Sequence, residues 1–277
     1  MPAVDSKPVI HRTTVCDRRE EAPGIVVLGL EAPGLARATR AGQFVMAVPP
    51  AGERAATALG VYEAEDERIS LMLVVVGPRT RELANLPVGA ALDLLGPLGN
   101  GFDLAALGSE SALVAGGVGL ASLLLPALQL TARGARVHLY YGARNAAALV
   151  DAERLKTLGL GVSLATDDGS RGFHGFVTEL FAREARAHDA IAACGPSPML
   201  RAVGRIAAER GVRAQLSLEE TFACGVGACW GCVVPLDRAS AQAPRFPPAP
   251  DERRDYVHAR ICKEGPVFWS DELRWRS

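Results

Sequence analysis

The sequence has little excess charge of either sign. Its 30 lysines and arginines nearly balance 31 aspartates and glutamates, which gives a formal net charge of −1 at pH 7. A protein with so small a net charge has no overall field that draws it to nucleic acid or to anionic lipid. The composition therefore disfavours both classes of partner.

The sequence also lacks an apolar leader at its N-terminus. Charged side chains are scattered through residues 1–20, where a secretory signal needs a continuous apolar segment. We therefore expect a cytoplasmic protein. Because the cytosol keeps thiols reduced, the six cysteines are not expected to form a disulfide framework.

A long apolar run is almost absent. Residues 112–130 carry no charge over a length close to that of a membrane span, but they include glycines, a proline and a glutamine. A buried strand, a glycine turn and a buried helix give the same pattern. We expect that soluble arrangement and no membrane span. No internal repeat is evident either.

Length and composition leave room for more than one folded unit. With 277 residues, of which 49% are hydrophobic and 22% charged, the chain has the composition of a globular protein. That length is enough for about two domains of ordinary size.

Short apolar runs and turn residues alternate along residues 8–98. Glu65 and Asp66 lie at the turn of an expected hairpin. Strands are expected in residues 24–30, 42–48, 58–64, 68–76 and 91–99. Several short strands at this spacing predict an antiparallel β-barrel or sandwich. We assign residues 1–101 to a β-barrel domain.

The pattern changes after Gly101, where strand-like runs begin to alternate with helix-like runs. This alternation predicts a parallel, doubly wound sheet that binds its ligand at the carboxyl ends of its strands. We assign residues 102–215 to an α/β dinucleotide-binding domain and residues 216–277 to a small C-terminal domain.

Two turns of this second domain have the character of a dinucleotide site. The turn "AGGVGLAS" contains Gly116, Gly117 and Gly119, and "ACGPSPM" contains Gly195 and Pro196. Glycines between a strand and a helix let backbone N–H groups approach a phosphate. The alternative is that these glycines only pack a helix against a sheet. Two such turns facing one crevice favour the binding interpretation.

Four of the cysteines have the spacing of an iron–sulfur site. Cys224, Cys229 and Cys232 follow the pattern C-x4-C-x2-C, and Cys262 lies further along the chain. This is the spacing of a plant-type [2Fe–2S] site. Glycine and alanine in "CGVGAC" let the backbone close around a cluster whose sulfides accept N–H hydrogen bonds.

Two alternatives to the cluster remain open at this point. Structural zinc with four cysteines generally uses two C-x2-C pairs, whereas Cys262 stands alone in "ARICKEG". Unligated cysteines are the other alternative. Cys16 and Cys194 stand apart from the four, and we expect them to behave as small buried hydrophobes.

The order of several motifs resembles one known family. From about residue 8 to about residue 270, the chain presents "VVGPRT", "LDLLGPLGNGF", "AGGVGLA", "TDDGSRGFHGFVTEL", "ACGPSPML", "QLSLEETFACGVGACWGCVV" and "CKEGPVF". In this order they resemble the electron-transfer subunit of the NAD-dependent dihydroorotate dehydrogenase, in the ferredoxin reductase-like superfamily. The cysteine block and "ICKEGPVF" are the most specific part of this resemblance.

The resemblance implies an oxidoreductase subunit that serves pyrimidine biosynthesis. It implies a catalytic partner subunit that contains FMN and oxidises dihydroorotate, in a heterotetramer. Electrons would pass from that partner through a [2Fe–2S] cluster and FAD to NAD+. The resemblance assigns the cluster to Cys224, Cys229, Cys232 and Cys262. It assigns the nicotinamide dinucleotide crevice to Gly116, Gly117, Gly119, Gly195 and Pro196.

The expected flavin site departs from the family pattern. Where the resemblance predicts Arg-Pro-x-Ser, with arginine on a flavin phosphate and serine on the flavin, the chain has Thr57, Ala58, Leu59 and Gly60. Where it predicts a Tyr-Arg pair, the chain has Leu73 and Val74. The turn that follows keeps the pattern at Gly77 and Thr80, and it carries Arg79. Arg79, Arg81 and Arg54 are candidates to supply the missing charge, or else are solvated surface residues.

Two other functions are therefore weighed against the first. One is a related ferredoxin or NAD(P)H reductase subunit with another partner. The other is an iron–sulfur subunit without flavin, with a structural or one-electron role. Trp230, between two expected ligands, is expected either to shield the cluster or to contact a partner. Residues 235–256, with five prolines, predict an extended surface segment.

Overall fold

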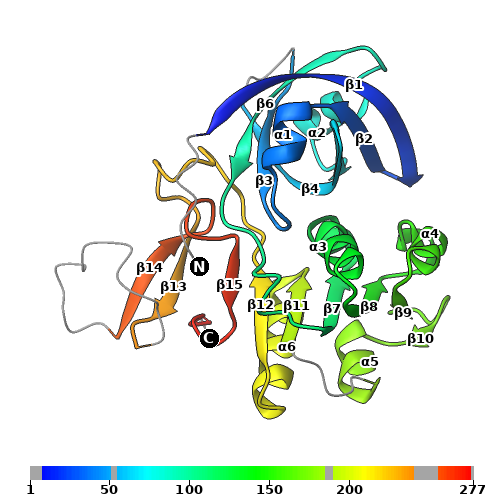
Figure 1. The fold of residues 1–277 in the computed structure, drawn as a ribbon, viewed down its shortest axis with the longest axis vertical. Helices are drawn as coiled ribbons and strands as arrows, with labels where there is room; N and C mark the ends of the chain where they lie inside the picture. The colour runs from blue at the N-terminus through cyan, green and yellow to red at the C-terminus, as the bar shows by residue number, and fades with distance from the viewer. Residues whose placement is uncertain (1–7, 51–54, 185–189, 240–254, 276–277) are drawn as a thin grey trace.

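The computed structural model describes residues 8–50, 55–184, 190–239 and 255–275. Figure 1 shows a barrel above a parallel sheet, with a small C-terminal unit beside both. Arg54 and most of the predicted surface segment 235–256 lie outside the described residues. Among the described residues, no helix is long and apolar enough to cross a bilayer.

The first unit is a closed, antiparallel six-stranded barrel in the order β1-β2-β5-β4-β3-β6. It is built from β1 (Val9–Ala22), β2 (Ile25–Glu31), β3 (Phe44–Val48), β4 (Thr57–Glu65), β5 (Arg68–Val74) and β6 (Ala91–Leu98). The helices α1 (Pro33–Ala38) and α2 (Pro78–Ala84) interrupt the strand sequence. The predicted barrel is therefore confirmed.

Alternating burial explains why the strands close into a barrel. Along β6 every second residue, from Leu92 to Leu98, is buried. This period of two turns one face of the strand into the barrel core. The expected β4–β5 hairpin is present, with Asp66 at a φ of 46°. Asp and Asn tolerate this left-handed conformation better than most residues.

Three features of the barrel differ from the prediction. The charged sequence of β1 did not indicate a strand, yet β1 pairs with both β2 and β6 and closes the barrel. The helices α1 and α2 were not predicted. The segment from Gly77 to Thr80 is not a turn but the start of α2, with Gly77 as its N-cap. Proline at the first helical position, here Pro78, favours that start.

The second unit is a seven-stranded sheet in the order β10-β9-β8-β7-β11-β12-β15. Its strands are β7 (Glu110–Gly116), β8 (Arg136–Ala143), β9 (Gly161–Thr166), β10 (Phe173–His174), β11 (Ala190–Cys194), β12 (Arg213–Ser217) and β15 (Val267–Trp269). The pairs from β10 to β12 are parallel, and β15 is antiparallel to β12. The predicted parallel sheet is confirmed.

Helices cover both faces of this sheet, as a parallel sheet requires. They are α3 (Leu120–Ala132), α4 (Ala152–Thr157), α5 (Val177–Glu184) and α6 (Ser197–Glu209), with 3-10 turns at Gly117–Gly119 and Ala146–Ala148. In Figure 1, α3 lies between the sheet and the barrel, where it contacts β4, and α5 and α6 lie on the other face. The uncharged run 112–130 divides between β7, the first 3-10 turn and α3.

The C-terminal residues form β13 (Val233–Asp237) and β14 (Tyr256–Arg260), which pair antiparallel, and then β15. The strand β15 extends the sheet of the second unit. Before β13, residues 218–232 form an irregular segment that contains three cysteines.

Candidate functional site

The cysteine loop, residues 224–232, is closed by hydrogen bonds from its backbone to its own sulfurs. The Cys224 sulfur accepts from the N–H groups of Ala228 at 3.3 Å and Cys229 at 3.4 Å. The Cys229 sulfur accepts from Gly231 at 3.4 Å. Burial opposes ionisation of Cys224, but these backbone donors outweigh it and lower its pKa to about 6. The loop therefore favours a thiolate at this position.

Positive φ angles let the loop turn this tightly. Gly225 has a φ of 68° and Gly227 a φ of 80°, a conformation that glycine adopts without steric cost. Trp230 also has a positive φ, of 58°. The residue is 47% exposed, so this tryptophan lies at the surface of the loop.

The four predicted ligands lie in two pairs. The thiols of Cys224 and Cys229 are hydrogen-bonded to each other, and so are those of Cys232 and Cys262. The N–H of Cys262 also donates to the Cys232 sulfur at 3.4 Å. The second pair is buried, and this burial, with the neighbouring Cys232 thiol, raises the pKa of Cys262 to about 12.

Within the described residues, no three His, Cys, Asp or Glu side chains are grouped as ligands for a single metal ion. A binuclear cluster uses its four cysteines differently, because each of its two irons takes two of them. In the structure, the first cysteine pair lies within the loop, and the second joins Cys232 of the loop to Cys262 of the neighbouring turn.

Asn100 fixes the turn that follows Cys262. Its amide donates to the carbonyls of Glu264 at 2.8 Å and Val267 at 3.0 Å, and its own carbonyl accepts from the Val267 N–H at 3.1 Å. Asn100 comes directly after the barrel, so these bonds hold the fourth cysteine against the barrel end. Sequence reasoning did not single out Asn100, although the motif "GPLGNGF" contains it.

The cysteine loop packs on the barrel strand β3. The rings of Phe222 and Phe44 are 5.0 Å apart. A Cβ placed on Gly225 would lie 2.5 Å from the Met46 sulfur, so only glycine permits this approach. In the β3–β4 ladder, Phe44 pairs with Gly60 and Met46 with Ala58. The loop therefore rests on the strand next to the predicted flavin strand.

The predicted flavin residues lie on β4, at the end of β5 and at the start of α2. Thr57, Ala58 and Gly60 are half-buried on β4, and Leu59 between them is buried in the barrel core. A Cβ on Gly60 would lie 3.2 Å from the Ser122 hydroxyl of α3. This part of β4 therefore faces the second unit, whereas Leu59 points away from it.

The other predicted flavin residues likewise divide between buried and half-buried positions. Leu73 is buried in the barrel core, whereas Val74, at the end of β5, is half-buried. Thr80 is buried, and its hydroxyl accepts from the N–H groups of Val76 at 3.0 Å and Gly77 at 3.1 Å. Arg79, on the first turn of α2, is half-buried. Thr80 thus fixes the start of α2, and Arg79 lies on the first turn of that helix.

The two predicted glycine turns meet at the carboxyl ends of β7 and β11. A Cβ on Gly195 would lie 3.0 Å from the Gly116 N atom, and one on Gly119 would lie 2.1 Å from the Cys194 carbonyl oxygen. Gly117 has no atom within 4 Å of its Cβ position. Gly116, Gly119 and Gly195 are therefore needed for packing between the turns, while Gly117 borders open space. Pro196 is exposed beside them, as the N-cap of α6.

A buried polar cluster lies beside these turns. Cys194 is fully buried, as predicted, and its thiol is hydrogen-bonded to Ser122 and Ser217 and lies 3.7 Å from the Glu219 carboxylate. Burial, followed by the charge of Glu219, raises the pKa of Cys194. Glu219 is exposed as a whole residue, but removal of water around its carboxyl group raises its pKa as well. Cys16, in contrast to the prediction, is only half-buried.

Sequence reasoning assigned Cys194 to the core and did not single out Ser122, Ser217 or Glu219. The sequence signal that could have identified them was their position at the ends of expected strands and at the start of an expected helix. Cys194 and Ser217 end neighbouring parallel strands, and Ser122 lies in the first turn of a helix that follows a glycine turn. The carboxyl ends of neighbouring parallel strands meet at one edge of the sheet.

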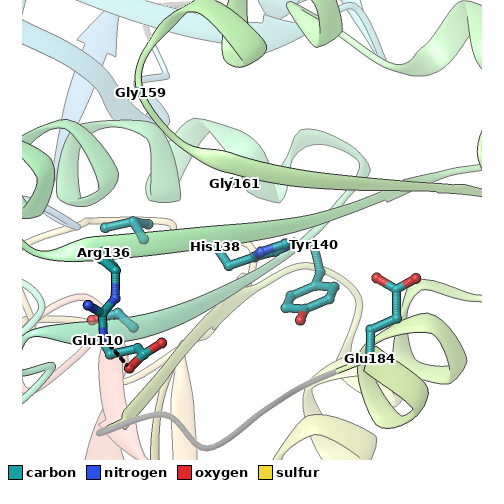
Figure 2. A pocket seen from close by; sticks show the side chains of 9 residues that line it. Glu110, Arg136, His138, Tyr140, Gly159, Gly161 and Glu184 are labelled. Atoms are coloured by element: carbon teal, nitrogen blue, oxygen red, sulfur yellow. Dashed lines mark hydrogen bonds and ion pairs between the residues drawn. The ribbon is translucent and has the colours of Figure 1, made fainter.

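A separate cavity of about 750 Å³ lies at the opposite edge of the sheet. Glu110, Arg136 and Gly161, the first residues of β7, β8 and β9, line it, together with Glu184 at the end of α5 (Figure 2). Glu110 and Arg136 form an ion pair at 2.8 Å. The cavity is at the amino ends of the strands and contains none of the predicted site residues.

Comparisons with known proteins agree on one family. The chain is 39% identical over 237 residues to a probable dihydroorotate dehydrogenase B (NAD+), electron transfer subunit, of Methanothermobacter thermautotrophicus, covering 86% of this chain and 80% of that relative. It is 35% identical to the corresponding Shouchella clausii subunit, covering 93% and 95%. No family model matches the chain.

Solved structures give the same fold. An NADH-dependent reduced ferredoxin-NADP oxidoreductase aligns with a TM-score of 0.79 and 25% identity, over 95% of this chain and 90% of that chain. A Neisseria gonorrhoeae ferredoxin NADP+ reductase, solved with FAD and NADP, aligns with a TM-score of 0.64 and 18% identity. That alignment covers 73% of this chain and 92% of the reductase, and it reports the fold alone.

Proposed function

Because this chain belongs to the family of the electron transfer subunits of dihydroorotate dehydrogenase B (NAD+), we propose that it carries electrons from a catalytic dihydroorotate dehydrogenase subunit to NAD+ through a [2Fe–2S] cluster and FAD. The chain is an oxidoreductase subunit of pyrimidine biosynthesis, and its family implies binding of FAD and NAD(H). The residues that hold each group are the subject of the proposal.

The cysteine residues fit a [2Fe–2S] cluster. Cys224 with Cys229 and Cys232 with Cys262 would each hold one iron. Three features of the loop support this: backbone N–H groups aimed at the sulfurs, glycines that permit the tight turn, and burial of the second pair. Hydrogen bonds and restricted solvent access of this kind are what a cluster site requires.

The residues on the barrel fit FAD in part. The half-buried residues Thr57, Ala58, Gly60 and Val74 would border the flavin, but β4 supplies no cation for its pyrophosphate. Arg79, half-buried on α2 beside Gly77, is our candidate for that cation. A charge-assisted bond to a phosphate contributes roughly 1.5–3 kcal/mol, so one arginine in place of two predicts weaker flavin binding.

The glycine turns fit a nicotinamide dinucleotide. Gly117 borders open space at the start of the helical segment that leads into α3, and Gly116, Gly119, Gly195 and Pro196 bring the two strand ends together. Backbone N–H groups at a helix start favour a phosphate. The buried thiol of Cys194 lies beside this crevice, between Ser122 and Glu219.

One observation supports the relay above the others. The cysteine loop packs on β3 through Phe222 and Gly225, and their contacts, Phe44 and Met46, pair with Gly60 and Ala58 of the flavin strand. When bound, a [2Fe–2S] cluster passes single electrons, NAD+ accepts a hydride, and FAD converts between one- and two-electron transfer. These contacts therefore support a cluster site next to the proposed flavin strand.

The partner would contain FMN and form a heterotetramer with this subunit. The mass of the copurified complex tests this stoichiometry. The barrel, dinucleotide and cluster domains would span residues 1–101, 102–215 and 216–277, with β15 of the last completing the sheet of the second. The protein would act in the cytoplasm.

The test is to purify the full chain with its partner anaerobically, release the cofactors by denaturation, and quantify FAD and iron. The proposal expects about one FAD and two irons per chain. Cys224→Ser is expected to lower the iron content, whereas the matched control Cys16→Ser, outside the loop, is expected to leave it unchanged. Equal iron in wild type and Cys224→Ser contradicts the cluster assignment.

The absence of an arginine between Thr57 and Gly60 favours a second candidate, an iron–sulfur subunit without flavin. Iron without FAD, even after incubation with added FAD, would support that candidate and contradict hydride transfer to NAD+. Reduction of the purified chain by NADH, followed through flavin and cluster absorbance, separates the two functions directly.

A further inference from the structure

A largely buried ion pair lies between the cysteine loop and the turn that carries Cys262. Arg260 ends β14, and its side chain is 13% exposed, while that of Glu264 is 6% exposed. The Arg260 Nε and Nη2 atoms donate to the two carboxylate oxygens of Glu264, at 3.1 and 2.8 Å. The Arg260 N–H also donates to this carboxylate at 2.8 Å. The pair is thus bidentate and further satisfied by the backbone.

The same arginine is attached to the cysteine loop at two points. Its Nη1 atom donates to the Gly227 carbonyl at 2.6 Å. Its guanidinium carbon lies 4.7 Å from the centre of the Trp230 ring, in a cation–π arrangement. Gly227 and Trp230 lie on either side of Cys229, so Arg260 connects the three-cysteine loop to the segment that carries the fourth cysteine.

Packing alone does not account for a charged pair at this position. Removing two charges from water is unfavourable, and apolar residues of similar volume often replace a buried ion pair without loss of stability. Lysine at position 260 would not make the same contacts, because one ammonium lacks the planar fork that bonds Glu264 and Gly227 together. The arrangement selects arginine and places its fixed charge against the loop.

We propose that Arg260 positions the cysteine loop and that Arg260 and Glu264 together set the reduction potential of the cluster. The inference rests on the proposed [2Fe–2S] site. The cluster gains one negative charge when it accepts one electron, and a nearby cation favours that charge while an anion opposes it. Arg260 therefore raises the potential and Glu264 lowers it.

Lys263 provides a matched control. It lies in the same turn, and its side-chain stem contacts the loop, because a Cβ on Gly227 would lie 2.8 Å from the Lys263 Cδ atom. Lys263 is exposed, however, unlike Arg260. Water and salt screen an exposed charge far more than a buried one, so its removal has a smaller effect on the cluster.

The experiment is a redox titration of the cluster in the full chain with its partner, followed by electron paramagnetic resonance of the reduced state. Arg260→Gln is expected to lower the midpoint potential, Glu264→Gln to raise it, and Lys263→Gln to shift it least. Arg260→Lys, which keeps the charge but loses the fork, is expected to retain the potential better than Arg260→Gln and to hold iron less firmly than wild type.

Iron content separates this inference from the function on which it rests. Wild-type protein without iron contradicts the proposed cluster itself. If Arg260→Gln loses its iron while Lys263→Gln keeps it, the positioning role is supported, and Glu264→Gln and Arg260→Lys decide the electrostatic role. Iron-loaded Arg260→Gln and Glu264→Gln proteins whose potentials shift in the same direction, or not at all, overturn the inference.

Discussion

The hydroxyl of Tyr62 donates a hydrogen bond of 2.5 Å to a carboxylate oxygen of Asp151, and so joins the barrel strand β4 to the segment before α4. Tyr62 has no exposed surface. Arg154 donates to the same oxygen of Asp151 at 3.0 Å and also pairs with Glu63 of β4. Burial, and then the charge of Asp151, raises the pKa of Tyr62, so the hydroxyl stays a donor at neutral pH. This network fixes one unit against the other through β4, the predicted flavin strand.

Tyr62→Phe is expected to lower the free energy of unfolding by about 1–3 kcal/mol, because it leaves the Asp151 carboxylate without one of its donors in a buried position. Urea denaturation measures the change. Lys156→Met, which breaks an exposed ion pair with Glu153 on the same short helix, is the control and should cost less than about 0.5 kcal/mol. Equal losses of unfolding free energy in the two variants would show that the buried Tyr62–Asp151 hydrogen bond contributes no more than the exposed ion pair.

Arg79→Gln is expected to weaken FAD binding by about 10- to 150-fold, which corresponds to the loss of one charge-assisted bond of about 1.5–3 kcal/mol. Quenching of FAD fluorescence on titration with flavin-free protein measures the affinity. Arg81→Gln tests the other candidate cation on helix α2; because Arg81 is exposed, whereas Arg79 is half-buried, its removal should leave the affinity unchanged. Equal affinity of Arg79→Gln and wild type removes Arg79 from the flavin site.

Gly225→Ala is expected to destabilise the cysteine loop for two reasons. Alanine at a φ of 68° costs about 1 kcal/mol, and its Cβ would lie 2.5 Å from the Met46 sulfur. Displacing Met46 adds about 1–3 kcal/mol. Thermal unfolding, with iron retained per chain as a second measurement, should show a larger loss than for Gly134→Ala, whose φ is 82° and whose Cβ position has no atom within 4 Å.

A double variant isolates the contact itself. Met46→Ala removes the atoms that an alanine at position 225 would meet. Combined with Gly225→Ala, it should therefore cost less than the sum of the two single substitutions. Strict additivity would mean that the loop does not press on β3 at Met46, which also weakens the argument that the cluster lies beside the flavin strand.

Local patterns made the main elements of the fold predictable and singled out the cysteines that we propose as cluster ligands. The strands of the barrel after β1 show in apolar runs and turn residues, and the proposed ligands show in a spacing of a few residues around Cys229. The strand β1 was missed because its sequence is rich in charge. It is a strand because it pairs with β2, which follows it directly, and with β6, which lies much further along the chain.

The contacts that position the site were not predictable in the same way. Arg260 and Glu264 read as two ordinary surface charges in "ARICKEG", and only the packing of the cysteine loop against their turn buries them. Asn100 reads as a loop residue, although its bonds reach Glu264 and Val267. Arg260 reaches Gly227 across 33 positions and Asn100 reaches Glu264 across 164, and the sequence pattern carries no signal of such pairings.

The carboxyl group of Glu21 gives the network around Asp151 a pH dependence. Burial, and then the charge of Asp151, raises the pKa of Glu21 above its ordinary value of 4.5, whereas Arg19 acts in the opposite sense from 3.1 Å. The folded protein therefore binds this proton more tightly than the unfolded chain. Stability from this group is fully present below pH 4.5 and is lost as the pH rises through the folded pKa.

Glu21→Gln cannot lose a proton, so its free energy of unfolding, minus that of wild type, is expected to increase with pH from about 4.5 upward and then level off. The slope cannot exceed about 1.4 kcal/mol per pH unit. Urea denaturation from pH 4 to pH 8 measures it. Arg19 pairs only with the ionised carboxylate, so its effect on the pKa of Glu21 is already included in this slope. Asp151→Asn removes the second cause of the raised pKa of Glu21. When Glu21→Gln is made in that background, the difference in unfolding free energy should therefore increase over a narrower pH range. A difference that is flat over the whole range, or that falls with pH, contradicts the proposed coupling between Glu21 and Asp151.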